Sequence, residues 1–477
     1  MRKRFEAQLT LGSTPIEQIQ IPLKSRDEFP QLLRALQHIY TDKELSEKIF
    51  GLLESVILPA HHTGRPGMDL WSIFVLASAR LCLNTDYDRL HYLSNADSLL
   101  RQMLGVHDGI FRGREFERQT IIDNVSLLDD ATLREINHVI VQAGHGVVKK
   151  KETEALQVKI DSFVTEANVH YPTDYNLLWD SARKCLDVLQ HLMDGDVLSN
   201  AGWRKKNYWR KGLKNRMLKV GRAVADKSKN REKRISEVVT DYLDFAGKLL
   251  EKISESFVAT LSHPMSIDLY YYQQMLVKHI DLVNRRLLKG EKIPHEEKIF
   301  SIFEPWVEWI CKGKAHKPVE LGKRTCIASD QWHFMVDWCV ANKQQDNKLL
   351  LPMMDRIRQK YHLISSCSGD TGFFSKIDVE TMELFDIKTF IPKKGKHSIA
   401  DLQRESDPEF IKARHRHSAV ESNINELEHR GLDRCPDKGI KGMHRYVGLA
   451  VIAYNLRRIG QILLERDRKE AELRMAA

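Results

Sequence analysis

The first 150 residues carry apolar side chains at intervals of three and four residues, which is the spacing of amphipathic helices. One such run consists of Leu32, Leu33, Leu36 and Ile39. We therefore predict an N-terminal helical domain over residues 1–150. Several short helices in a basic chain favour a DNA-binding unit of the helix-turn-helix kind. A purely structural helical domain is the alternative.

The period changes to strict alternation at Leu156, where every second residue is apolar as far as Ile160 and the run leads into Asp161. Residues 173–299 return to helical spacing. Strand and helix patterns then alternate. In order they are a hairpin of strands over 324–328 and 334–341, a helix over 347–361, a strand over 363–368, a helix over 375–385, a strand over 387–391 and two closing helices.

With the helical block set aside, the order of elements is three strands, helix, strand, helix, strand, helix. This order matches the ribonuclease-H-like fold, a mixed sheet flanked by helices. We therefore predict an α/β ribonuclease-H-like catalytic domain formed by residues 155–172 and 300–465. A large all-helical insertion would occupy residues 173–299. A chain of 477 residues is long enough for two or three packed units.

The formal charge of +9 favours a polyanionic partner. Basic residues are densest between Trp203 and Arg234, where 14 lysines and arginines stand against two acids. Trp203, Tyr208 and Trp209 are interleaved with them, as expected where a cation binds phosphate and a ring packs on sugar or base. A solvated helical surface is the alternative. The predicted DNA contacts in this tract are Arg204, Lys205, Lys206, Arg210, Lys211, Lys214 and Arg216.

Seven scattered cysteines without a CxxC pair favour neither a zinc site nor a disulfide framework. The basic N-terminus is not followed by the apolar segment of a secretory signal. The longest apolar stretch, residues 70–83, is interrupted by Arg80 and is shorter than the roughly 18 to 20 residues that span a membrane. We therefore expect a soluble, cytoplasmic protein with no membrane partner.

Three acids stand where folds of this type carry out polynucleotide chemistry: Asp161 on the first strand, Asp370 after the fourth strand and Glu421 on a late helix. Phosphodiester hydrolysis and transesterification need an activated nucleophile and neutralised charge, which two divalent ions roughly 3.5 to 4 Å apart can supply. Carboxylates suit Mg²⁺ or Mn²⁺. Each acid alone is more typical of a strand cap or a helix surface, and only the joint pattern indicates a metal site.

At these acids the chain resembles a known family. The segments KIDSFVTEANVHYPTDYNLLWDSARK (159–184), SSCSGDTGFFS (365–375) and RHRHSAVESNINELEHRGLDRC (414–435) are similar to the signature blocks of bacterial insertion-sequence transposases of the DDE class. The resemblance is closest to the ISNCY group and covers about residues 60 to 465.

This resemblance implies a transposase that cuts at the ends of its mobile element and joins the freed 3'-hydroxyls to target DNA. Asp161 and Asp370 would share two Mg²⁺ or Mn²⁺ ions, and Glu421 would complete the shell of one. The partner would be double-stranded DNA, both the terminal inverted repeats and the target. A homodimer or a larger assembly on DNA is expected, because two element ends must be paired.

The chain departs from the family pattern at four positions. Thr371 stands where related families usually have lysine. Arg414, His417 and Glu428 stand where neighbouring groups have tyrosine, arginine and lysine. Arg414 and Arg416 are the candidate replacements as DNA contacts, and His417 is a candidate phosphate contact.

Other acids compete for the second metal position, namely Asp330, Asp337 and Asp346 near predicted strand ends. Asp337 in particular is a candidate to face the sheet edge beside Asp161. Asp370 is preferred because its neighbouring glycines leave the backbone open to metal and phosphate. The remaining candidates are Lys314, Lys317 and Lys323 as groove lysines, and Glu166 and Asp174 as structural acids.

Two alternative functions stay open. The first is a structure-selective nuclease or resolvase with the same fold, which would cut without joining. The second is a domesticated DNA-binding protein that has lost the chemistry, which would bind DNA without metal and without cleavage.

Overall fold

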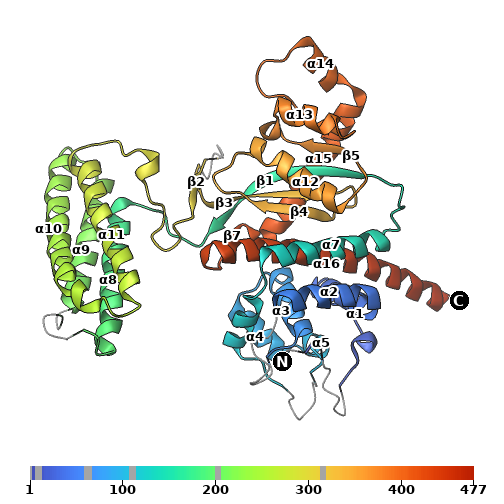
Figure 1. Ribbon diagram of the computed structural model, residues 1–477, viewed down its shortest axis with the longest axis horizontal. Helices are drawn as coiled ribbons and strands as arrows, with labels where there is room; N and C mark the ends of the chain where they lie inside the picture. Colours follow the sequence, from blue (N-terminus) through green and yellow to red (C-terminus); the bar gives the residue numbers. More distant parts are fainter. Residues whose placement is uncertain are drawn as a thin grey trace. The chain divides into compact units, whose positions relative to one another are not determined.

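The computed structural model describes residues 3–5, 13–57, 67–106, 114–198, 203, 206–311 and 318–476. The chain forms two compact units, which are described separately. Unit 1 consists of residues 1–168 and 310–477, and unit 2 consists of residues 169–309, drawn in green and yellow in Figure 1. Unit 2 therefore begins four residues before the predicted insertion over 173–299 and ends ten residues after it.

The sheet of unit 1 is built around β1 (Leu156–Ala167). β3 (Glu320–Ser329) runs antiparallel to β1, and β4 (Met335–Val340) runs antiparallel to β3. On the other side of β1, β5 (Ile364–Gly369) is parallel to β1, and β6 (Lys388–Phe390) is parallel to β5. These strands follow the order β4, β3, β1, β5, β6, and the short strands β2 (Glu308–Ile310) and β7 (Arg434–Cys435) bring the mixed sheet to seven. The predicted mixed α/β class is confirmed.

The helices of unit 1 include seven that precede β1. They are α1 (Phe29–Thr41), α2 (Lys43–Val56), α3 (Leu70–Cys82), α4 (Tyr87–Ala96), α5 (Ser98–Met103), α6 (Arg118–Val125) and α7 (Asp130–Val147). The helices after β4 are α12 (Leu350–Lys360), α13 (Lys376–Glu383), α14 (Ile399–Ser406), α15 (Pro408–Leu427) and α16 (Gly439–Ala476). Helices α12 and α13 lie within a few residues of the predicted positions, because the apolar spacing that predicted them also forms their buried faces. Helix α14, which buries no side chain, was not predicted.

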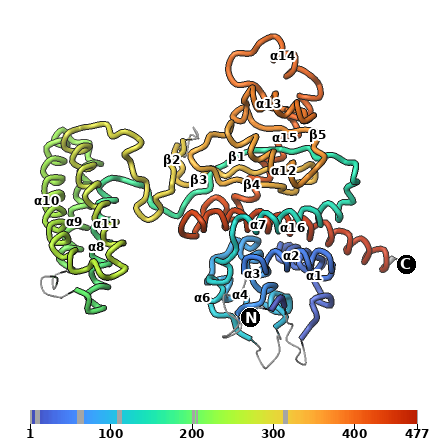
Figure 2. Tube along the Cα trace, in the orientation of Figure 1, coloured from blue at the N-terminus to red at the C-terminus, as the bar shows by residue number. Residues whose placement is uncertain are grey.

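The last helix, α16, is the centre of the helical part of unit 1. It packs against α1, α3 and α7, and Figure 2 shows α7 and α16 side by side. The N-terminal helices, predicted as a domain of their own, therefore share one unit with the sheet. By length and composition, Gly439–Met475 alone among the described helices is apolar enough to cross a membrane, but most of its apolar window is buried inside the protein. This burial is typical of a core helix.

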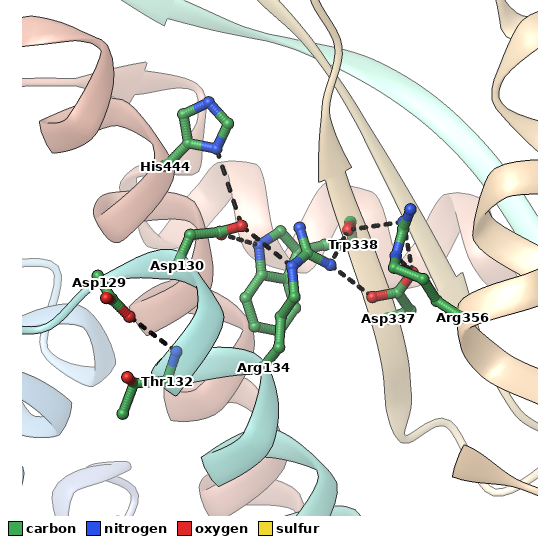
Figure 3. Close-up of polar contacts among 8 residues, drawn as sticks. All are labelled: Asp129, Asp130, Thr132, Arg134, Asp337, Trp338, Arg356 and His444. Carbon is green, nitrogen blue, oxygen red and sulfur yellow. Dashed lines mark hydrogen bonds and ion pairs between the residues drawn. The ribbon is translucent and has the colours of Figure 1, made fainter. Parts of the chain in front are cut away.

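A polar network joins α7 to the outer strand β4 (Figure 3). Asp337 on β4 is buried and accepts hydrogen bonds from Arg134 (2.6 Å) and Arg356 (2.7 Å). The Arg134 guanidinium lies 4.6 Å from the centre of the Trp338 ring, whose indole nitrogen donates to Asp130. Burial raises the pKa of the Asp337 carboxyl, although both arginines act to lower it. Asp337 is therefore part of the packing between helix and sheet.

Gly460 marks the closest approach between α16 and α1. A Cβ atom built there would lie 1.7 Å from the backbone oxygen of Gln31. We expect Gly460→Ala to destabilise unit 1 by about 1 to 3 kcal/mol or more, because overpacking forces backbone to move. The shift in urea unfolding midpoint measures this effect. Gly51→Ala in α2 is the matched control, because nothing lies within 4 Å of its added Cβ, and an unchanged midpoint for Gly460→Ala would contradict the close contact.

Unit 2 is all helical apart from its connecting segments, as predicted. Its helices are α8 (Asp174–Asp194), α9 (Lys206–Ala225), α10 (Arg231–Phe257) and α11 (Ser266–Val283), which continues into the π-turn η3 (Asn284–Leu288). One apolar core runs between them and includes Leu178, Leu189, Val239, Leu249 and Leu276. This core explains the long helical spacing along residues 173–299.

Candidate active site and basic surfaces

The strand register places Asp161 and Asp370 beside each other. β1 and β5 pair in parallel with Ile160 opposite Gly369, and each aspartate follows by one residue. Asp370 keeps an extended backbone, with φ −69° and ψ 162°. Because neighbouring strands lie about 4.8 Å apart, the two aspartates occupy adjacent positions where this pairing ends.

β1 continues beyond β5 and meets a second parallel partner. It pairs with β5 as far as Ile160 and with β7 from Glu166 onward. In the described pairings, Asp161 and the four residues after it therefore lie between the end of β5 and the start of β7. On this side of β1, Asp161 is therefore the first residue beyond the pairing with β5, while on the other side it stays paired with Ile327 of β3.

Helix α15 packs against β1, β5 and β6 and is tied to the end of β5. The His417 ring contacts Ser368, with 3.1 Å between Nδ1 and Oγ. Arg414 donates to the carbonyl oxygen of Gly369 (3.2 Å) and lies 4.0 Å from a carboxylate oxygen of Asp370. These contacts fix the first half of α15 beside the second aspartate.

Glu421 lies on α15 one turn beyond His417 and one turn before Asn425. Residues four apart on a helix share a face. His417 is held at the end of β5, and Asn425 lines a cavity of about 290 Å³ together with Val164 of β1. Glu421 lies between these two residues along α15, and its side chain is exposed.

Asp161 and Asp370 hold adjacent strand positions, but the three carboxyl groups do not form a preformed metal site. Asp161 accepts a hydrogen bond from the backbone of Ser162 (2.6 Å), the Asp370 side chain is 60% exposed, and Glu421 is exposed. Among the described residues, no three His, Cys, Asp or Glu side chains are placed to hold a metal ion. The three carboxylates suit a hard divalent cation as a donor set, but their side chains would have to turn toward one another to share it.

All three competing acids are engaged in hydrogen bonds, and one of them, Asp346, lies beside the candidate site. Buried Asp330 bonds to His145 (2.6 Å). Asp337 lies on β4, which β3 separates from β1, so the prediction that it could flank Asp161 is wrong. Asp346 accepts hydrogen bonds from Arg324 and from the hydroxyl of Ser162 (2.6 Å), the residue after Asp161, and its carboxylate lies beside Gly372. Asp370 is the most exposed of these candidates, which favours it as the second ligand.

Two basic cavities of about 320 and 410 Å³ lie along α15, and both are lined by Lys159 and Arg416. The first is also lined by Lys412 and Glu409. Burial lowers the pKa of the Lys159 ammonium. Because alternate residues of a strand share a face, Lys159 and Asp161 project from the same face of β1. The structure thus puts Arg414 and Arg416, both predicted DNA contacts, near the candidate site.

Comparisons with protein-family models, curated proteins and solved structures found no match to this chain. The functional interpretation therefore depends on the residues and their geometry.

Two predicted DNA contacts of the basic tract are already engaged within unit 2. Arg210 donates to Asp187 (2.5 Å), and Arg216 donates to Asp241 (3.0 Å). The Arg216 guanidinium also lies 4.0 Å from the centre of the Phe245 ring. Both arginines hold helices together, and contact with DNA would have to use their remaining surface.

The lysines of α9 face solvent. Lys211 and Lys214 are exposed on the helix surface. Arg204 and Lys205 lie outside the described residues, and only the backbone of Lys206, the first residue of α9, is described. Among the predicted contacts whose side chains are described, Lys211 and Lys214 are therefore the exposed ones.

The aromatic residues of the tract differ from the prediction that rings and cations alternate on one DNA surface. Trp203 is buried, and its indole nitrogen donates to Ser256 (3.0 Å). Trp209 packs on Phe245, with 5.0 Å between ring centres. Only Tyr208 of the three is largely exposed, at 59%. Burial in the core of unit 2 removes Trp203 from DNA contact, and Trp209 is half-buried against that core.

The departures from the family pattern have structural roles here. His417 is buried, which lowers its pKa to about 4, so its ring is neutral near pH 7. This burial argues against the predicted phosphate contact. Thr371 begins the 3-10 turn η6 (Thr371–Phe373) after Asp370, and Glu428 lines the cavity beneath the end of α15.

The three lysines predicted to line a groove are not found in that role among the described residues. Lys323 is buried and donates to Asn342 (2.9 Å), so it does not line a groove. Lys314 and Lys317 lie outside the described residues. Sequence analysis missed Lys159, although a lysine two residues before a candidate metal ligand on an alternating strand was the available signal.

Proposed function

We propose that the protein is a metal-dependent DDE transposase with a ribonuclease-H-like catalytic core. The pairing of Ile160 with Gly369 carries this proposal, because it makes Asp161 and Asp370 neighbours from segments about 200 residues apart. The strand order β4, β3, β1, β5, β6, with one antiparallel pair on one side of β1 and parallel strands on the other, also supports it. Helix α15, which carries Glu421, packs against both β1 and β5, and this packing is compatible with the proposal.

Bound divalent ions would activate the attacking hydroxyl and neutralise charge on the phosphate. Asp161 and Asp370 are the proposed shared ligands, and Glu421 is proposed to complete the shell of one ion. Arg414 lies against Asp370 and offsets part of its negative charge. Arg416 and Lys159 are proposed to bind the phosphates that flank the reacting one, because both line the cavities along α15.

A strand-transfer assay tests this function. Purified full-length protein is incubated in Mg²⁺ with labelled duplexes that carry the inverted repeats flanking its gene, together with a supercoiled target plasmid. We expect cuts that leave 3'-hydroxyls and products in which these ends are joined to the plasmid. Nicks without joined products would favour a nuclease or resolvase. DNA binding without cuts in Mg²⁺ or Mn²⁺ would favour a domesticated DNA-binding protein.

The exposed lysines of α9 give a second prediction. We expect Lys211→Ala with Lys214→Ala to weaken binding to repeat and random duplexes about equally, because interactions with phosphate carry no sequence information. The slope of log K against log salt concentration should become shallower by about 0.9 for each phosphate that the variant no longer neutralises. Fluorescence anisotropy between 50 and 200 mM salt measures both effects.

The charge-matched control is Lys248→Ala with Lys289→Ala, since both lysines are exposed in unit 2 outside α9. An equal loss of affinity in the two double variants would show that general charge, and not the α9 surface, governs binding.

A further inference from the structure

Unit 2 contains a cavity of about 380 Å³ that the proposed catalytic chemistry does not use. Its wall is formed by the segment 171–175 ahead of and within the first turn of α8, by the turn after α11 and by residues from His295 to Trp309. This volume is near the lower end of small-ligand sites, which hold roughly 300 to 1,000 Å³. By volume, the cavity therefore suits one small ligand or one group of a larger ligand.

Aromatic rings form a continuous wall of this cavity. The ring centres of His295 and Phe300 are 5.3 Å apart, those of Phe300 and Trp309 are 5.5 Å apart, and those of Trp309 and Tyr171 are 5.6 Å apart. Tyr171, at the open end of the series, is 60% exposed. A row of rings that reaches solvent offers a stacking surface for another aromatic group.

Charged groups stand beside this wall. Arg286 and Lys298 line the cavity, and the Arg286 side chain is 53% exposed. Arg286 donates to Asp174 (2.9 Å), which holds the guanidinium at the cavity. Rings with adjacent cations fit a ligand that combines a flat π system with a phosphate. The Asp174 carboxylate is compatible with such a ligand, because it can accept a hydrogen bond from the exocyclic amino group of adenine, cytosine or guanine.

We propose that this cavity binds an unpaired nucleotide, with the base on the Trp309 and Tyr171 rings and the phosphate near Lys298 and Arg286. Bases inside a duplex are stacked and cannot reach a pocket of this size. The nucleotide therefore comes from an unpaired position in DNA or from free nucleotide, and both present the same chemistry. The inference concerns unit 2 alone, so it stands or falls separately from strand transfer.

The test uses full-length protein and a 12-residue single strand with one central 2-aminopurine, a fluorescent adenine analogue that is quenched by stacking. We expect quenching on binding, and about a tenfold or greater loss of affinity in Tyr171→Ala and in Trp309→Ala. Tyr171→Phe and Trp309→Phe should retain affinity because they keep the ring. Tyr171 is exposed, so its alanine variant tests the site even if Trp309→Ala fails to fold.

Three further measurements test whether the cavity binds an unpaired base. A blunt duplex with the same analogue should show no quenching, and a single strand with an abasic site at that position should bind more weakly than the intact strand. Competition by dAMP at a similar affinity would support the site and identify free nucleotide as a sufficient ligand. Equal affinity of abasic and intact strands, or full quenching in both alanine variants, would overturn the proposal.

Discussion

Asp370→Asn is expected to lower strand cleavage at least about 10³-fold while leaving DNA affinity within about twofold. Metal ions contribute several kcal/mol of charge stabilisation, and each 1.36 kcal/mol is a factor of ten in rate. The substitution keeps the size of the side chain but removes the charge that attracts a cation. The side chain is exposed, so the fold should not change. Single-turnover cleavage in Mg²⁺ and anisotropy binding on the same duplex measure the two quantities.

Asp161→Asn and Glu421→Gln should have the same effect, because the three acids act as a unit and their individual effects do not add. Asp355→Asn is the matched control, since Asp355 is an exposed aspartate of α12 outside this region. Cleavage retained in all three variants would refute the assignment of these acids. Cleavage abolished in Asp161→Asn and Glu421→Gln but retained in Asp370→Asn would mean that another acid supplies the second ligand.

Arg80→Met is expected to destabilise unit 1 by about 3 to 5 kcal/mol, since removing one partner of a buried ion pair leaves an uncompensated charge. Arg80 on α3 forms two hydrogen bonds with Asp437 (2.6 and 3.0 Å), and the two side chains are only 2% and 9% exposed. The guanidinium also lies 3.9 Å from the centre of the Tyr87 ring. The free energy of unfolding in urea, followed by tryptophan fluorescence, measures the destabilisation.

Two comparisons make this test specific. Arg118→Met breaks an ion pair with Asp88 in which both side chains are largely exposed, and it should cost under about 1 kcal/mol. The double variant Arg80→Met with Asp437→Leu should recover stability, because no buried charge is left. Equal effects of Arg80→Met and Arg118→Met would contradict a buried role for the Arg80 pair.

The strands and helices of the sheet region could be predicted from the sequence, because their apolar periods are set by the faces they bury. Alternation up to Ile160 predicted β1, and the pattern after residue 300 predicted every later strand that pairs in the β4 to β6 order. Strand order is not contained in such a pattern. The sequence therefore allowed Asp337 as a neighbour of Asp161, whereas in the structure β3 lies between their strands.

Exposure was the second quantity that the sequence did not determine. Trp203 stands among lysines and arginines, yet its ring is buried in the helical core of unit 2. His417 follows several basic residues, yet it lies on the buried face of α15 and contacts Ser368. Local composition describes neighbours along the chain, whereas burial depends on residues from distant segments. The convergence of carboxylate side chains is subject to the same limit, because it depends on rotamers and bound cations.

The position of unit 2 within the chain has a consequence for synthesis on the ribosome. β1 is complete at Ala167, but its antiparallel partner β3 ends only at Ser329, roughly 160 residues later. At about 5 to 20 residues per second, this delay lasts on the order of 8 to 30 seconds. During it, a strand with buried Val158 and Ile160 waits without neighbours while the helices of the insertion emerge. The exposed apolar face of β1 therefore makes the nascent chain most prone to aggregation during this interval.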